Sequence, residues 1–153
     1  MWNKSPGLTR ARNGARPVRT TAALLGALML SAIAPEARAQ ECRAPAGAAR
    51  AAILDAVRTP VASDLRTAVE FRVERARLCG PWAFVLATPQ KPGGGAIRWA
   101  GTPCEGDTSH LVGALLRRKS GGWAVVDYAL CPSDVAWVDW PQKYNAPAVL
   151  FEE

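Results

Sequence analysis

The sequence predicts an α+β fold: an antiparallel, curved β-meander of four to five strands, with an N-terminal helix packed on it and a short C-terminal helix. Three observations predict it. A helical repeat of apolar residues comes first, strand-like segments separated by turns follow, and a second helix start comes near the end. Strands joined by turns pair as antiparallel neighbours, and one amphipathic helix can cover one face of their sheet.

The N-terminal helix is expected over residues 47–58. Ile53 and Val57 belong to an apolar row at helical spacing, with charged residues mostly on the other faces. Pro60 is expected to end the helix, because the residue before a proline avoids the helical region. A short helical turn is expected around residues 63–67.

The next two segments predict a pair of strands. Residues 69–78 alternate between apolar and charged, but the alternation changes phase near Glu74–Arg75, which predicts a β-bulge there. A turn at Gly80-Pro81 follows. Residues 82–87 are apolar at every position, which is typical of a central strand covered on both faces.

The second half of the sheet is expected to contain a hairpin. Residues 111–118 and 123–130 are strand-like and are separated by Ser120-Gly121-Gly122. Between the two halves lies a loop rich in proline and glycine over residues 88–95, and residues 97–100 are expected to form a short strand.

The C-terminal helix is expected to begin at Pro132-Ser133-Asp134. Ser133 can cap it, and Asp134 lies where the helix dipole favours a negative charge. Pro141 is expected to end or bend this helix.

The first 39 residues have the form of a secretory signal peptide. Basic residues precede an apolar run from Ala22 to Ala34, and Ala37-Arg38-Ala39 gives the small-x-small pattern that a signal peptidase cuts. The run is shorter than the roughly 20 residues that span a bilayer, so no stable membrane anchor is expected after cleavage. We therefore expect residues 1–39 to be removed and residues 40–153 to form a single periplasmic or secreted domain.

Cleavage removes most of the positive charge. The chain has 19 Lys and Arg against 13 Asp and Glu, a formal net charge of +6. Residues 1–39 hold six of the basic and one of the acidic residues, which leaves 13 against 12. A nearly neutral domain has no electrostatic basis for nucleic-acid binding. The remaining basic clusters, such as Arg75 with Arg77, are interpreted as solvated charges.

The four cysteines all lie after the predicted cleavage site. An even number in an exported domain predicts two disulfides, with three possible connectivities. We favour the pairs Cys42–Cys79 and Cys104–Cys131. A metal site would need close cysteine pairs, and the spacings of 37, 25 and 27 residues do not provide them. No metal or other cofactor is expected.

One stretch resembles a known family. The layout resembles the curved-sheet domains of the cystatin-like and NTF2-like kind, and Gly122-Trp123-x-Val125-Val126-Asp127-Tyr128 is similar to the late-strand pattern of many NTF2-like proteins. NTF2-like domains usually begin with more helix and rarely end with one after this strand, so the chain departs from them at both ends. The whole segment of residues 40–153, including 127–130 and 134–137, is also similar to small exported bacterial proteins of unassigned function.

Asp127 is the candidate polar residue of a binding site. Its place in the strand alternation matches Trp123, Val125 and Ala129, an otherwise apolar face. Its carboxylate is therefore expected to be ion-paired, exposed at the rim of the sheet, or lining a pocket. In NTF2-like enzymes a carboxylate in the concave face of the sheet can act as a general base, and the resemblance implies this alternative role for Asp127.

Aromatic residues near the C-terminus are the other candidates. Trp137, Trp140 and Tyr144 are spaced as one helical stripe, which either packs on the sheet as core or lines a cleft for a ligand or protein partner. Trp99, beside the glycine loop, is the tryptophan expected to be most exposed.

The sequence contains no convincing catalytic set. His110 is the only histidine and follows Asp107 and Ser109, but neighbours in sequence rarely converge as a triad. No Gly-x-Ser-x-Gly motif is present. We therefore expect an exported, non-enzymatic domain that binds an unknown protein or small-molecule ligand. The expected binding residues are Asp127, Trp137, Trp140 and Tyr144.

Overall fold

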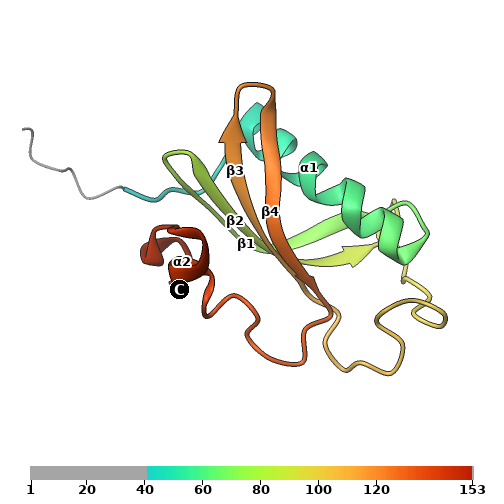
Figure 1. Cartoon of the computed structure of the whole chain (residues 1–153). Helices are drawn as coiled ribbons and strands as arrows, with labels where there is room; N and C mark the ends of the chain where they lie inside the picture. The colour runs from blue at the N-terminus through green and yellow to red at the C-terminus, as the bar shows by residue number, and fades with distance from the viewer. Residues whose placement is uncertain (1–40, 153) are drawn as a thin grey trace, which may run out of the picture. The chain divides into compact units, whose positions relative to one another are not determined.

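An open sheet of four antiparallel strands, covered by a helix, gives the chain an α+β fold, as predicted (Figure 1). The structure, a computed structural model, describes residues 41–152; the expected signal peptide at residues 1–39 lies outside these residues. The strands lie in chain order across the sheet. The elements are α1 (Gly47–Leu65), β1 (Glu70–Cys79), β2 (Trp82–Gln90), β3 (Val112–Lys119), β4 (Gly122–Leu130), α2 (Trp140–Tyr144) and the 3-10 helix η1 (Ala148–Leu150).

The predicted strand pairs and turns are confirmed. Gly80-Pro81 joins β1 to β2, and the short connection after Lys119 joins β3 to β4 in the expected hairpin. The register of β1 against β2 shifts between Val73 and Arg75, which confirms the bulge. Six of the nine residues of β2 are buried and none is exposed, as the continuous apolar sequence of its first part predicts.

The helix α1 is longer than expected, because Pro60 does not end it. Its buried row recurs every four residues, at Ile53, Val57, Val61 and Leu65. Stopping at Pro60 would expose the last two, and burying each such side chain contributes about 1.5–3 kcal/mol. That gain outweighs the cost of roughly 3 kcal/mol for a proline inside a helix. The turn expected at residues 63–67 is therefore the end of α1.

The expected strand at residues 97–100 is wrong. Strands β2 and β3 pair directly with each other, from Trp82 with Arg117 to Ala87 with Val112, so no position is open between them for a further strand. Residues 97–100 are instead part of the long β2–β3 connection and form no strand pairing. Its Ile97 side chain is buried in the core.

The expected helix start at residues 132–134 is also wrong. The chain has no helix over residues 131–139, and α2 begins at Trp140 with Pro141 in its first turn. Pro141 therefore starts this helix instead of ending it. A proline fits the first helical turn because that N–H has no partner within the helix.

Both faces of the sheet are covered. Side chains of α1 and one face of the strands form the helix-side cluster, which includes Ile53, Val57, Val85 and Ala114. Residues 131–152, here called the C-terminal segment, cross the opposite face, so that α1 and α2 lie on opposite sides of the sheet (Figure 1). There they form the C-terminal cluster with the other face of the strands. Its largest members are Phe84, Leu115, Trp137, Trp140 and Leu150.

Both favoured disulfides are confirmed. The Cα atoms are 4.4 Å apart in the pair Cys42–Cys79 and 5.6 Å apart in the pair Cys104–Cys131. The first joins the segment before α1 to the end of β1, and the second joins the β2–β3 connection to the end of β4. Two disulfides are consistent with an extracellular or otherwise oxidising compartment. Within residues 41–152, no helix is long and apolar enough to cross a membrane.

Candidate functional site

A bulge in β4 changes the face on which Asp127 lies. Leu115 pairs with Asp127, but its neighbour Leu116 pairs with Val125. One residue of β4 between Val125 and Asp127 therefore has no partner in β3. Trp123 and Val125 pack in the helix-side cluster, whereas the carboxylate of Asp127 bonds to residues of α2 on the other face. The expectation that Asp127 shares a face with Trp123 and Val125 is therefore wrong, because simple alternation does not pass through a bulge.

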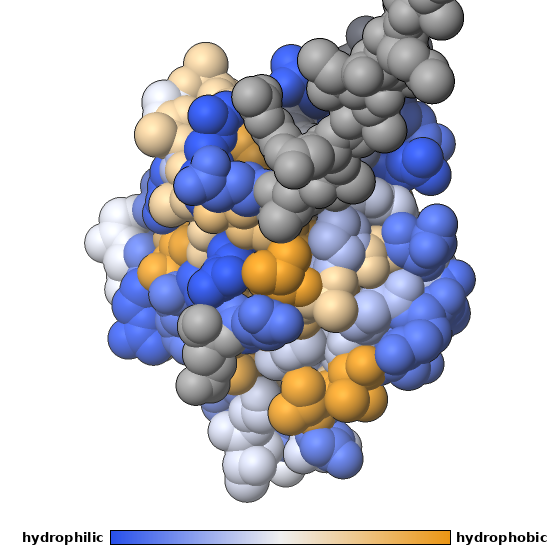
Figure 2. All heavy atoms as spheres, turned by 90° about the vertical axis from the view of Figure 1, so that its left-hand side faces the viewer, coloured by the Kyte–Doolittle hydropathy of each residue, from blue (hydrophilic) through white to orange (hydrophobic). Residues whose placement is uncertain are grey.

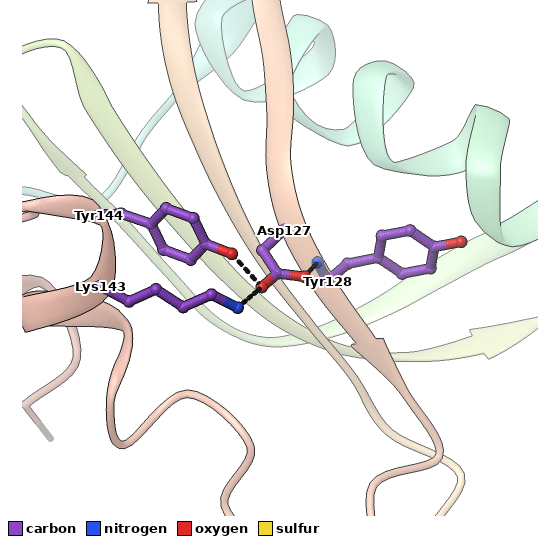
Figure 3. Close-up of polar contacts among 4 residues, drawn as sticks. All are labelled: Asp127, Tyr128, Lys143 and Tyr144. Carbon is purple, nitrogen blue, oxygen red and sulfur yellow. Dashed lines mark hydrogen bonds and ion pairs between the residues drawn. The ribbon is translucent and has the colours of Figure 1, made fainter.

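The carboxylate of Asp127 is fully engaged in the contact between β4 and α2 (Figure 3). Its Oδ2 atom accepts a hydrogen bond from the Tyr144 hydroxyl at 2.5 Å and pairs with Lys143 Nζ at 3.1 Å. Its Oδ1 atom accepts the backbone N–H of Tyr128 at 2.8 Å. The arrangement fixes α2 against the sheet.

These bonds hold Asp127 in its charged form. Partial burial alone would raise the pKa of Asp127, but the hydrogen bonds from Tyr144 and Lys143, and the positive charge of Lys143, outweigh it and leave the pKa below its usual value. Its hydrogen bonds to Tyr144 and Asp127 raise the pKa of Lys143 above its usual range. A carboxylate with a lowered pKa and three donors is a weak base, so the geometry favours a structural role for Asp127.

Tyr128, the residue after Asp127, makes a contact of the same kind on the helix side of the sheet. The hydroxyl of Tyr128 donates to Asp64 of α1 at 2.6 Å. That hydrogen bond, together with burial and the negative charge of Asp64, raises the pKa of Tyr128 to about 12. In Figure 3 the side chains of Asp127 and Tyr128 point to opposite sides of β4. Neighbouring residues of one strand thus bind the two layers that cover the sheet.

The two C-terminal tryptophans are core residues. Trp137 is 9% exposed and Trp140 is 3% exposed. Their rings lie around Phe84, with centroids at 5.5 Å and 6.4 Å. The two tryptophans were expected to form one stripe with Tyr144. Tyr144 is half-buried, but its hydroxyl donates a hydrogen bond to Asp127.

The aromatic residues of the β2–β3 connection stack on each other. The rings of Trp99 and His110 are parallel, with an interplanar angle of 1° and centroids 4.1 Å apart. Trp99 and Trp123 are half-buried, whereas the other three tryptophans of residues 41–152 are buried. Among residues 41–152, no group of three or more His, Cys, Asp or Glu side chains could hold a metal ion.

A basic hollow lies at the outer edge of β1, where the sequence predicted only solvated charges. It has a volume of about 500 Å³ and is lined by the segment before α1, by the first turn of α1 and by residues 73–77 of β1. Four arginines from these segments surround it. We call Arg43, Arg50, Arg75 and Arg77 the arginine cluster.

The charge of the arginine cluster is not neutralised by nearby acids. Glu74 also lines the hollow, but it accepts a hydrogen bond from Thr88 at 2.7 Å and pairs with Arg72 at 3.6 Å, outside the cluster. Within residues 41–152, no salt bridge links a member of the cluster to a carboxylate. The hollow is therefore lined by arginines whose positive charge is not paired with a carboxylate of the described residues, which favours the binding of an anion.

Two members of the cluster also hold the C-terminal segment. Arg77 Nη1 donates to the carbonyl of Val149 at 3.0 Å, and Arg75 Nη1 donates to the carbonyl of Glu152 at 3.1 Å. A guanidinium has five N–H groups, so each retains donors. The buried Nε of Arg75 has no hydrogen-bond partner among residues 41–152.

The sequence contained only part of the signal for this cluster. The pair Arg75 and Arg77 is visible in the alternation of β1, but Arg43 and Arg50 come from other segments that only the fold brings beside it. Comparisons with protein-family models, with curated proteins and with solved structures gave no match to this chain. The function must therefore be argued from the geometry.

Proposed function

We propose that this protein is an exported, non-enzymatic binding domain whose ligand carries an anionic group that the arginine cluster receives. The observation that supports the proposal is the hollow at the edge of β1, which is lined by four arginines and by one glutamate whose carboxylate is engaged elsewhere. Arginine binds carboxylate and phosphate groups through paired N–H donors. The site differs from the one that the sequence predicted at α2.

The proposed location is the periplasm or the exterior of the cell. The form of residues 1–39 as a signal peptide supports export, and the two disulfides support an oxidising compartment. Measuring the intact mass of the exported protein before and after reduction would test this part of the proposal. We expect the loss of residues 1–39 and the presence of two disulfides.

The enzyme alternative, with Asp127 as general base, has less support. The carboxylate already accepts hydrogen bonds from Tyr144, Lys143 and the backbone, and its lowered pKa makes proton abstraction unfavourable. No similar obstacle applies to anion binding at the arginine cluster, which needs only positive charge and free donors.

Titration calorimetry of the oxidised exported protein with pyrophosphate and with citrate, at low salt, would test the proposed ligand class. We expect binding that the double variant Arg43→Gln, Arg50→Gln weakens about tenfold, which corresponds to about 1.4 kcal/mol. These two arginines are chosen because neither side chain forms a hydrogen bond or ion pair within residues 41–152. Raising the salt concentration should also weaken binding.

The matched control removes the same charge elsewhere. Lys91 and Arg98 are exposed in the β2–β3 connection, so the double variant Lys91→Gln, Arg98→Gln changes the net charge equally without touching the hollow. We expect it to bind both anions as the unchanged protein does. Absence of binding, or equal weakening in both double variants, would contradict the proposal.

A further inference from the structure

We infer that the occupant of the arginine hollow is an extended acidic segment of a partner protein, which pairs with the outer edge of β1 as a fifth strand. This inference rests on the proposed function and specifies its ligand. It starts from the position of β1, which has β2 on one side and is the edge of the sheet. An edge strand presents backbone N–H and C=O groups that another extended chain can pair with.

The protein itself begins such a pairing. Arg43 forms an isolated antiparallel bridge to Leu78, with its N–H donating to the Leu78 carbonyl at 3.0 Å and the Leu78 N–H donating back at 2.8 Å. The pairing ends after this one residue pair, because the chain turns away towards α1 and Pro45 has no N–H to donate. The rest of the β1 edge continues into the hollow.

The backbone groups at this edge can be assigned. Leu78 points its N–H and C=O outwards to Arg43, and alternate residues of a strand direct these groups to the same edge. Ala76 therefore directs its N–H and C=O outwards as well, into the hollow that it lines. Among residues 41–152, the outer edge of β1 before Leu78 makes no backbone hydrogen bond to another segment.

Arginines flank this edge on both faces of the sheet. Arg43 lies opposite Leu78, whose side chain is on the helix side, and Arg50 belongs to α1 itself. Arg75 and Arg77 reach the C-terminal segment on the other face. The side chains of an added strand alternate between the two faces. Acidic side chains at both odd and even positions of the strand would therefore meet guanidinium groups.

The same charges exclude a second copy of this chain as the occupant. Pairing two β1 edges would bring the arginine clusters of both copies together, and like charges on opposite strands are destabilising. A small anion would use the guanidinium groups but leave the outward N–H and C=O of Ala76 without a partner. An extended acidic segment satisfies both the charges and the backbone groups.

The test uses the oxidised exported protein and the peptide acetyl-Glu-Val-Glu-Glu-Val-Glu-amide, which carries acidic side chains at odd and even positions. Two further peptides have methyl groups on either the odd or the even backbone amides, which blocks hydrogen bonding from one edge of the peptide at a time. A bound strand pairs through a single edge. We therefore expect one methylated peptide to bind about tenfold more weakly and the other to bind nearly as well as the parent peptide.

A protein variant tests the same backbone hydrogen bonds by changing β1 instead of the peptide. In Ala76→Pro the outward N–H is removed, and a proline is tolerated in an edge strand whose N–H faces solvent. We expect this variant to lose about tenfold in affinity for the peptide and much less in affinity for pyrophosphate. If it does not fold, as judged by circular dichroism, the pair of methylated peptides still decides the question.

The outcomes separate the inference from the proposed function. Equal binding of all three peptides, or binding of pyrophosphate without binding of the peptide, would overturn strand addition and leave anion binding intact. If the unchanged protein bound neither pyrophosphate nor citrate nor the peptide, both strand addition and the proposed anion binding would be overturned. Binding of a heparin oligosaccharide at the same arginines, without binding of the peptide, would identify a polysaccharide instead of a protein partner and overturn the inference.

Discussion

The two layers that cover the sheet are built differently. On the helix side, α1 presents a row of aliphatic side chains from a regular helix that forms its own backbone hydrogen bonds. On the other side, the C-terminal segment has little regular structure and packs aromatic rings around Phe84. Figure 2, viewed from the side on which α2 lies in Figure 1, shows apolar patches separated by hydrophilic side chains.

The difference shows what an irregular layer requires from its support. A helix satisfies its own N–H and C=O groups, whereas a segment without regular structure needs other partners for them. Here the sheet supplies two such partners, because Arg77 and Arg75 donate to backbone carbonyls at the end of the C-terminal segment. Asp127 adds bonds to the side chains of Lys143 and Tyr144. Polar side chains of β1 and β4 thus hold the C-terminal segment, and those of β1 supply hydrogen bonds that a helix would form within its own backbone.

The largest expected effect comes from removing the centre of the aromatic layer. Phe84 is fully buried, and the rings of Trp137 and Phe151 lie 5.5 Å and 5.0 Å from its own. We expect Phe84→Ala to reduce the free energy of unfolding by about 4 kcal/mol, because it removes a large buried side chain and leaves a cavity. Urea denaturation followed by circular dichroism, with the disulfides intact, measures this.

The corresponding change on the helix side sharpens the comparison. Val57 is also fully buried. Val57→Ala removes less volume and should cost about 2 kcal/mol. A smaller loss for Phe84→Ala than for Val57→Ala would show that the C-terminal segment is a loosely attached layer, contrary to its close packing in the structure.

A smaller effect is expected where Trp137 lies directly on β3. A Cβ atom at Gly113 would come within 2.5 Å of Cε3 of Trp137, closer than carbon atoms can approach. We expect Gly113→Ala to cost about 1–3 kcal/mol, as overpacking in a core usually does, by pushing Trp137 away from the sheet. Amide hydrogen exchange should speed up more in the C-terminal segment than in α1.

The control for this variant is Gly121→Ala in the β3–β4 turn. A Cβ atom there meets nothing within 4 Å, so we expect little change in stability or exchange. If Gly113→Ala accelerates exchange equally in both layers, the segment and the helix unfold together. The two layers would then be one cooperative unit despite their different construction.

This asymmetry also explains how much could be predicted from the sequence. The four strands of the sheet, the hairpin, the β1 bulge and both disulfides follow from local alternation, turn residues and cysteine positions, and these predictions are confirmed, whereas the strand expected at residues 97–100 is absent. The predicted end of α1 at Pro60 is wrong, because burial of Val61 and Leu65 in the core outweighs the local effect of Pro60. Local patterns describe the regular layer well for this reason, apart from its end.

The candidate site was harder to predict, because it depends on contacts between distant segments. The bulge in β4 places Asp127 on the face of the sheet opposite to Trp123 and Val125. The alternation of apolar and polar residues between Trp123 and Ala129 gives no sign of this bulge. The arginine cluster needs Arg43 and Arg50 beside β1, which only the fold and the Cys42–Cys79 disulfide bring about. Charge in the sequence could suggest the pair in β1 but not the hollow.

Asp127→Asn tests the polar anchor of the irregular layer and should cost about 1 kcal/mol at neutral pH, since the side chain keeps its shape but loses its charge. The pKa of Asp127 is lowered in the fold, so its contribution is present above its unfolded value of about 3.9 and is lost as the pH falls through the lower folded value. The difference in unfolding free energy between the two proteins should therefore narrow below about pH 4.

The exposed Asp134 provides the control, since among residues 41–152 its carboxylate accepts a hydrogen bond only from the neighbouring backbone N–H of Val135. Asp134→Asn should be nearly neutral at every pH. A difference for Asp127→Asn that stays constant down to pH 2 would contradict the assignment of Asp127 as a charged anchor.

A similarly small effect is expected at Tyr128, which contacts α1 on the helix side. Tyr128→Phe removes the hydrogen bond to Asp64 and should cost about 1 kcal/mol at neutral pH, less than the aliphatic packing of α1 contributes. The folded pKa of about 12 lies above the ordinary tyrosine value of about 10. The contribution of Tyr128 is therefore complete below pH 10 and is lost as the pH rises from about 10 to 12. Titration of tyrosinate absorbance should show a step near pH 12 that Tyr128→Phe removes. If this step persisted in Tyr128→Phe, the hydrogen bond to Asp64 would not hold the tyrosine proton, and the helix side would depend on packing alone.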